Sequence, residues 1–202
     1  MTATDQISAR LREVAIVQPG YLSRGRVRST TKGTHLLIQA RDVSPATGIR
    51  TEGATRFVPE RKAELYQINE GDVLVVARGR AHRAHHVDQR LENALAAATF
   101  YILRPRPDAI RSGYLAWWLN LPSVQAAIAG SARGTSIPYV SREAIEGLRV
   151  PLPPASTQQR IERVVALWRK KLALQHQLDA KREDYIQALC ERAVNRSEEH
   201  QR

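Results

Sequence analysis

The spacing of hydrophobic positions changes near residue 156 and divides the chain into two parts. Before this point, short apolar runs bounded by Gly and Pro are typical of strands and short helices. After it, residues 157–195 contain no Gly or Pro and are rich in good helix formers. At 1.5 Å per residue, a helix over this stretch would be about 58 Å long, which is more than one domain usually covers.

The first part predicts a mixed α/β domain over residues 1–155, so the fold class is α+β. Pro151, Pro153 and Pro154 end it, because proline interrupts helices and central strands. Apolar runs predict strands at 35–40, 57–58, 73–77, 94–103 and 148–150. Residues 5–17 mix helix-like and strand-like patterns, so 14–17 is predicted only as a short entry segment. Helical spacing predicts helices at 114–129 with a break at Pro122 and at 142–145 with Ser141 as N-cap, and residues 60–66 are predicted as a short helix or turn.

The second part, residues 156–202, predicts one long helix with a disordered tail. Its apolar residues fall on two faces, which indicates two neighbours: the chain's own domain and a partner helix. Polar side chains at Gln175, Asp179 and Arg182 favour an antiparallel homodimer, since a parallel pair would stack like side chains. Docking of a single helix on another protein is the alternative. The residues predicted to form the dimer are Ile161, Val165, Trp168, Leu172, Leu178, Tyr185, Ile186 and Leu189.

Charge favours a polyanion partner for the domain. The chain has 202 residues, a net charge of +11 and a pI near 10.5. Residues 156–202 hold 10 Lys and Arg against 7 Asp and Glu, which leaves 21 against 13 in residues 1–155. Cys190 is the single cysteine, and the apolar run at 14–17 is too short for a signal peptide or a membrane span. We therefore expect a cytoplasmic protein that does not bind a membrane.

Basic residues concentrate in three segments that suit phosphate or base contacts. Arginine can donate two parallel hydrogen bonds to a phosphate or a guanine edge. In each segment a solvated loop is the alternative, and the three histidines of the first segment lack a fourth ligand for zinc. The predicted DNA-binding residues are Arg78, Arg80, His82, Arg83 and His85 in 77–90; Arg133, Thr135, Ser136 and Tyr139 in 130–139; and Arg26, Arg28 and Lys32 in 24–32.

Two other features have simpler interpretations. Trp117 and Trp118 could stack on bases, but their helical spacing favours the core. The sequence lacks a phosphate-binding loop, a nucleophile elbow and the tetrapeptide of adenine methyltransferases. Glu60-Arg-Lys62 matches a common nuclease triplet in a solvated stretch, so catalysis, a metal and a cofactor are not expected.

Several motifs resemble the specificity (S) subunits of Type I restriction-modification systems. The resemblance covers most of the chain and is strongest from 114 to 161. The motifs are YLAWWLNLPSVQ at 114–125, GTSIPYV at 134–140, LRVPLPP at 148–154 with Gln158, Gln159 and Ile161, NEGDVLVVARG at 69–79 and QALCERAVN at 187–195.

The resemblance implies a non-catalytic subunit whose target recognition domain reads part of a DNA site and whose long helix is a spacer. It also implies an adenine-specific DNA methyltransferase subunit and a restriction subunit as partners. One domain pattern and one helix are present where the full-length subunit has two of each, which indicates a half-subunit that binds a bipartite site as a homodimer. A stand-alone DNA-binding regulator is the main alternative, and a nuclease is the third.

Overall fold

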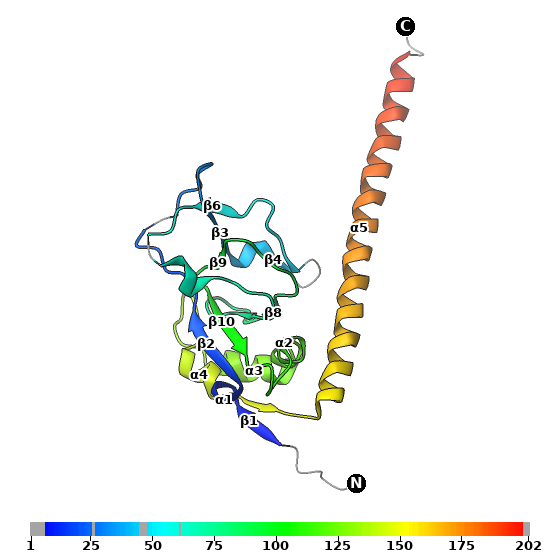
Figure 1. Cartoon of the computed structure of the whole chain (residues 1–202). Helices are drawn as coiled ribbons and strands as arrows, with labels where there is room; N and C mark the ends of the chain where they lie inside the picture. Colours follow the sequence, from blue (N-terminus) through cyan, green and yellow to red (C-terminus); the bar gives the residue numbers. More distant parts are fainter. Residues whose placement is uncertain (1–6, 26, 45–47, 61, 200–202) are drawn as a thin grey trace.

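A computed structural model describes residues 7–25, 27–44, 48–60 and 62–199, which form a domain followed by one long helix (Figure 1). The helix α5, Ala155–Glu199, starts beside the domain and extends past its far end. The architecture is α+β with a long C-terminal helix, which confirms the predicted fold class. Pairing of this helix with a second chain stays a prediction.

The largest sheet has four antiparallel strands in the order β2, β10, β7, β8. Its two faces are covered by different parts of the domain. Val73 and Val75 belong to a core cluster shared with helices, whereas Leu74 belongs to a cluster shared with a second sheet. The central strand is therefore apolar on both sides. The bounds are β2 Ala15–Pro19, β7 Val73–Val76, β8 Ala84–His86 and β10 Phe100–Pro105.

The second sheet has three strands in the order β6, β3, β9. β3 runs antiparallel to β6 and parallel to β9. These strands are β3 His35–Ile38, β6 Thr55–Phe57 and β9 Ala94–Ala96. Short elements complete this half of the domain: η1 Ala40–Asp42, β4 Val43–Ser44, β5 Gly48–Ile49 and η2 Ala63–Tyr66.

Helices cover the other face of the four-stranded sheet. Pro122 occupies the first turn of α3, so the predicted break between the two helices is confirmed. The Ser141 hydroxyl accepts a hydrogen bond from the Ala144 N–H at 3.2 Å, as predicted for an N-cap. Trp118 is buried, which confirms its core assignment. The helices are α1 Leu11–Val14, α2 Ser112–Leu119, α3 Pro122–Gly130 and α4 Arg142–Glu146.

A small ladder joins the start of the domain to the root of the long helix. β1, Ser8–Arg10, pairs antiparallel with β11, Arg149–Pro151, which directly precedes α5. The first segment of the domain therefore helps to fix the point from which α5 departs.

Two predictions about strands were wrong. The run 94–103 is two strands, because a turn closed by the Phe100 N–H and the Ala97 carbonyl at 2.9 Å moves the chain from one sheet to the other. The basic segment 77–90 is not one loop, because strand β8 lies within it.

Candidate nucleic-acid interface

Backbone hydrogen bonds join two of the three predicted DNA-binding segments. The Gly79 N–H donates to the Pro138 carbonyl at 2.9 Å, and the Val140 N–H donates to the Ala77 carbonyl at 2.9 Å. Arg133 and Tyr139 exchange two backbone hydrogen bonds of 2.8 Å each and so close the second segment into a loop. We call residues 78–80 together with 133–139 the basic ridge.

Two glycines allow the turns of this ridge. Gly79 has φ +121° and Gly134 has φ +92°, conformations that residues with a Cβ rarely adopt. The Tyr101 hydroxyl donates to the Val140 carbonyl at 3.0 Å and ties the base of the loop to the central sheet. Burial raises the pKa of Tyr101, so this hydroxyl stays a neutral donor at physiological pH.

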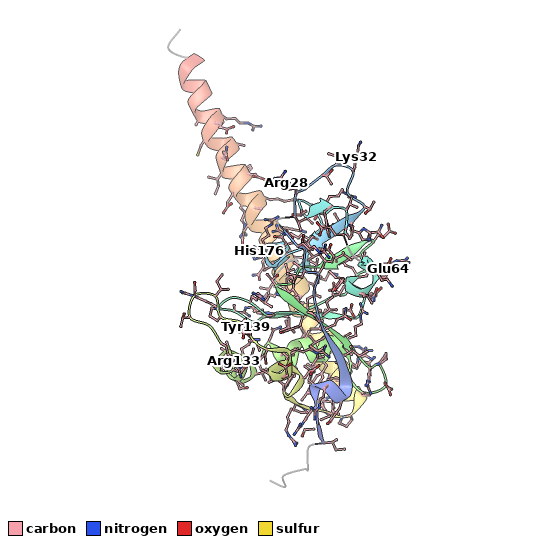
Figure 2. All side chains as sticks on the ribbon, turned by 90° about the vertical axis from the view of Figure 1, so that its left-hand side faces the viewer. Arg28, Lys32, Glu64, Arg133, Tyr139 and His176 are labelled. Carbon is pink, nitrogen blue, oxygen red and sulfur yellow. The ribbon has the colours of Figure 1, made fainter. Side chains whose placement is uncertain are left out.

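The basic ridge is exposed and has no acidic residue. Figure 2 shows Arg133 and Tyr139 close together on a loop that projects from the domain. Three guanidinium groups and three hydroxyls along the ridge could donate to phosphates or base edges. Its exposed side chains are Arg78, Arg80, Arg133, Thr135, Ser136, Ile137 and Tyr139.

The histidines of the first segment do not share this exposure, and their role in DNA binding stays a prediction. His82 is 2% exposed, and its Nδ1 lies 2.9 Å from the Val76 carbonyl oxygen. His85 is 9% exposed on strand β8, where burial and then the charges of Arg169 and Arg83 lower its pKa to about 4. Both imidazoles lie largely inside the domain, and His85 also lines the cleft beside α5.

Arg83 is exposed but lies away from the basic ridge, in a cleft between the domain and α5. The third segment is also separate. Arg28 and Lys32 are exposed, and Figure 2 shows them at another end of the domain from Arg133 and Tyr139. Arg26 lies outside the described residues. The structure thus assembles two of the three candidate segments.

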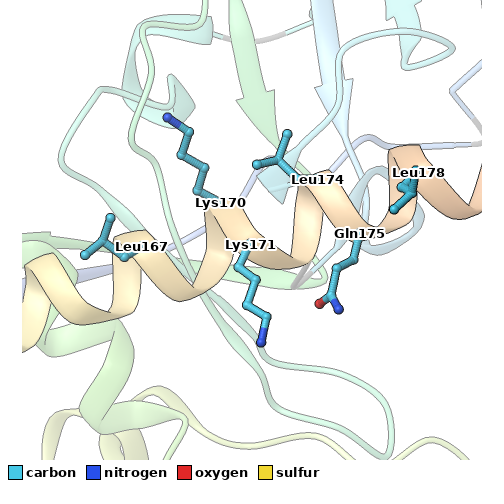
Figure 3. A pocket seen from close by; sticks show the side chains of 6 residues that line it. All are labelled: Leu167, Lys170, Lys171, Leu174, Gln175 and Leu178. Carbon is cyan, nitrogen blue, oxygen red and sulfur yellow. The ribbon is translucent and has the colours of Figure 1, made fainter.

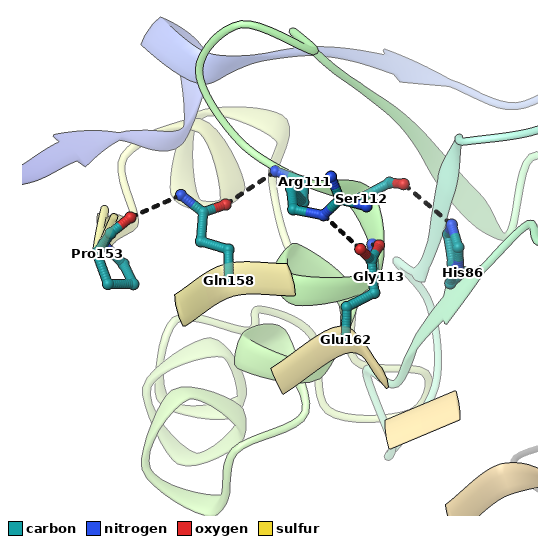
Figure 4. A network of polar contacts seen from close by, with 7 residues as sticks. All are labelled: His86, Arg111, Ser112, Gly113, Pro153, Gln158 and Glu162. Carbon is teal, nitrogen blue, oxygen red and sulfur yellow. Dashed lines mark hydrogen bonds and ion pairs between the residues drawn. The ribbon is translucent and has the colours of Figure 1, made fainter. Parts of the chain in front are cut away.

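A polar network fixes α5 against the start of α2 (Figure 4). Buried Gln158 accepts from the Arg111 N–H at 3.0 Å and donates to the Pro153 carbonyl at 2.9 Å. Glu162 accepts from the Gly113 N–H at 2.9 Å and forms an ion pair with Arg111. Glu162 therefore caps α2, whose own N-cap residue makes no side-chain cap.

The two apolar faces of α5 have different surroundings. Ile161 packs on the domain core, and Val165 and Leu172 line the cleft. The chain's own domain occupies this face at Ile161, whereas the dimer assignment of Val165 and Leu172, which line an open cleft, stays a prediction. The other predicted dimer residues are exposed: Trp168, Leu178, Tyr185, Ile186 and Leu189.

The exposed side of α5 also includes Leu167 and Leu174, which were not in the predicted dimer set. Leu167, Leu174 and Leu178 line a shallow depression beside Lys170, Lys171 and Gln175 (Figure 3). The depression is almost entirely apolar despite the neighbouring lysines. It is the part of α5 best suited to receive another helix.

The described residues contain no helix that is long and apolar enough to cross a membrane. No group of three His, Cys, Asp or Glu among them could hold a metal ion. Glu60 and Lys62 of the nuclease-like triplet lie on the exposed surface, and Arg61 is outside the described part of the chain.

The fold matches that of the S subunits of Type I restriction-modification systems. The S subunit of M. genitalium aligns with 83% of this chain at a TM-score of 0.55 and 14% identity. The HsdS subunit of Thermoanaerobacter tengcongensis aligns with 94% at a TM-score of 0.60 and 19% identity. A third chain comes from a structure that addresses complex assembly and conformational transition of the type I R-M system. It aligns with 94% of this chain at a TM-score of 0.58 and 17% identity.

This chain spans 40%, 43% and 44% of the length of those three chains. No family model and no curated protein sequence matches it. The resemblance seen in the sequence motifs is therefore confirmed by structure, at the level of the fold.

Sequence reasoning missed three parts of the site. Ile137 is an apolar residue of the basic ridge that is 68% exposed. Glu162 and Arg169 were not among the predicted residues, although both face the domain. Glu162 and Arg169 are seven residues apart, as are Val165 and Leu172, so all four fall on one face of the helix. This spacing could have indicated that the two charged residues face the domain.

Proposed function

We propose that this chain is a half-length specificity subunit that recognises DNA for a Type I-like restriction-modification complex. The observation that carries the proposal is the exposed basic ridge on a domain with the S-subunit fold. The ridge brings arginines and hydroxyls from two distant segments into one surface, the combination that reads base edges and holds phosphates.

The proposed partners follow from the fold and from the half length. The chain itself binds DNA, while an adenine-specific methyltransferase subunit and a restriction subunit supply the chemistry in the cytoplasm. Two copies pair through the exposed face of α5 and recognise a bipartite site. This face offers Leu167, Leu174, Leu178 and Tyr185, which a second helix would cover.

The ridge is tested by the double variant Arg78→Ala, Arg80→Ala. The matched control is Arg12→Ala, Arg149→Ala, which removes the same charge from two exposed arginines near the β1–β11 ladder. The site is first identified by methylome sequencing of a host that carries the chain with its methyltransferase. Affinity for that duplex is then measured by fluorescence anisotropy at fixed salt.

We expect the ridge variant to bind its site at least about 10-fold more weakly, since each bidentate base contact contributes about 1–3 kcal/mol. The control should bind nearly as the unaltered chain does. Equal affinity of the two variants would show that the ridge does not bind DNA. Site binding without any methylation in the host would favour a stand-alone regulator.

A further inference from the structure

A cleft of about 590 Å³ lies between the domain and α5, away from the basic ridge. Arg83, His85 and His86 line it from the segment that contains β8. Val165, Arg169 and Leu172 line it from the helix. We call this space the helix–domain cleft.

Arg169 is half-buried in this cleft and lacks a hydrogen bond or ion pair to any described residue. Burial lowers its pKa, opposed by the charge of Asp88. A guanidinium taken partly out of water without a directly contacting anion costs free energy, and a bound anion would offset that cost. Arg83 and Lys170 add two exposed cations at the rim.

The acidic groups around the cleft do not balance these cations. Glu162 is occupied by Arg111 and by the N–H of Gly113. Asp88 is exposed at the edge, and no ion pair joins it to a described residue. The cleft therefore has a net positive charge even without its histidines.

The histidines are neutral at physiological pH but respond to charge in the cleft. The pKa of His85 is lowered to about 4 by burial, then by Arg169 and Arg83. The pKa of His86 is lowered by burial and by Arg169, while Asp88, Glu162 and Glu70 oppose this shift. An anion beside Arg169 would weaken its repulsion of a second positive charge and so raise the pKa of His85.

We propose that the helix–domain cleft binds one phosphate group of the duplex backbone through Arg169. The proposal rests on the proposed function and adds a contact made by the spacer helix to those made by the domain. A planar guanidinium suits phosphate, and Val165 and Leu172 offer an apolar wall for a sugar. Arg83 follows Arg80 by only three residues, so a duplex on the ridge has a short path to the cleft.

The test compares Arg169→Ala with Arg163→Ala in the full-length chain. Arg163 is an exposed arginine on the same helix outside the cleft, so both variants lose one charge. Affinity for duplex DNA is measured over a series of salt concentrations. Losing one phosphate contact should reduce the slope of log affinity against log salt by about 1 for Arg169→Ala and leave it unchanged for Arg163→Ala.

Arg169→Lys provides a variant that keeps the charge in case Arg169→Ala does not fold, and it should retain the slope. A second measurement follows the imidazole resonances of the unaltered chain by NMR as pH is varied. Addition of duplex should raise the pKa of His85 from about 4. Inorganic phosphate and an acidic peptide are added separately, and phosphate should reproduce the rise.

Equal slopes for the two alanine variants, with an unmoved His85 pKa, would overturn the cleft contact and leave site recognition by the ridge intact. A rise of the pKa with the acidic peptide and not with duplex would also overturn it, because the cleft would then bind a carboxylate of another protein. If the unaltered chain binds no duplex in the presence of its partners, the proposed function fails as well.

Discussion

At the scale of single residues, the buried imidazole of His85 stays neutral because of its surroundings. The ring lies on β8 and lines the helix–domain cleft together with Arg83 and with Arg169 of α5. Burial withholds the water that would solvate a protonated ring, and protonation would also place a positive charge near the guanidinium groups of Arg169 and Arg83. The lowered pKa, about 4, is the direct consequence.

This lowered pKa predicts a loss of stability in acid. The unfolded chain takes up a proton at His85 near pH 6.5, whereas the folded chain does so only near pH 4. The free energy of unfolding therefore falls as pH drops through this window, by on the order of 3 kcal/mol in total. His85→Leu should lose less stability than the unaltered chain between pH 7.5 and pH 5, measured by urea unfolding.

His176→Leu is the control, because it removes an exposed histidine from α5. It should keep the full pH dependence. If His85→Leu behaves like His176→Leu, the stability of the fold does not depend on a neutral imidazole at position 85.

The sequence identified the basic residues but not their depth. Arg78, Arg80 and Arg133 are exposed as expected, because an arginine without an ion-pair partner is rarely buried. His82 and His85 alternate with arginines in the same segment, and histidine is stable in either environment. His85 is buried because β8 pairs with β7, and the ring of His82 is held by a contact between its Nδ1 and the Val76 carbonyl, neither of which the sequence shows.

At the scale of elements, the joint between α2 and α5 determines where the long helix points. Glu162 caps α2, and Gly113 makes the close approach possible, since a Cβ there would lie 2.5 Å from the Glu162 Cγ. Gln158 links the same joint to the proline connector. The direction of α5 therefore depends on a few hydrogen bonds at its first two turns.

We predict that Glu162→Ala weakens this joint by about 1–2 kcal/mol, the usual cost of losing an N-cap. The amide hydrogen of Gly113 should exchange with solvent at least about 5-fold faster. Glu183→Ala, on the exposed part of α5, is the control and should change neither quantity. Hydrogen exchange followed by NMR, with urea unfolding, gives both values.

Gly113→Ala offers an independent check on the same joint. It leaves the carboxylate in place but crowds it, so it should produce the same faster exchange around α2. Normal protection in both variants would show that the Glu162 cap is not needed, and that Gln158 and the packing of Ile161 fix the helix.

Element prediction succeeded where the hydrophobic pattern was decisive. The strand at Val73–Val76 has both faces buried, and the long helix has no interrupting residue, so both were predictable. The run 94–103 was not, because β9 and β10 belong to different sheets and no Gly or Pro marks the turn between them. The covered and exposed faces of α5 are similarly apolar, so the pattern could not say which one the domain occupies.

At the scale of the whole molecule, α5 connects the proposed DNA surface to a proposed second copy. Its 45 residues extend over about 68 Å at 1.5 Å per residue. The domain covers only the first turns, and Leu174, Leu178 and Tyr185 remain exposed beyond it. Apolar residues at this spacing on an otherwise polar helix favour a helical partner.

The last prediction concerns the symmetry of the DNA site. Two copies joined by a two-fold axis present identical surfaces to the two strands, so the site should consist of inverted half-sites separated by unread bases. Leu174→Glu with Leu178→Glu should give a monomer by light scattering and abolish site-specific methylation in the host. Weak DNA binding by the domain should persist, because the basic ridge is unchanged.

Gln177→Glu with Ala180→Glu adds the same two charges to exposed positions outside the apolar depression and should leave both dimer and methylation intact. An asymmetric methylated motif, together with a monomeric unaltered chain, would exclude the homodimer. The apolar face of α5 would then receive a different S-like chain, since two unlike domains are needed to read two unlike half-sites.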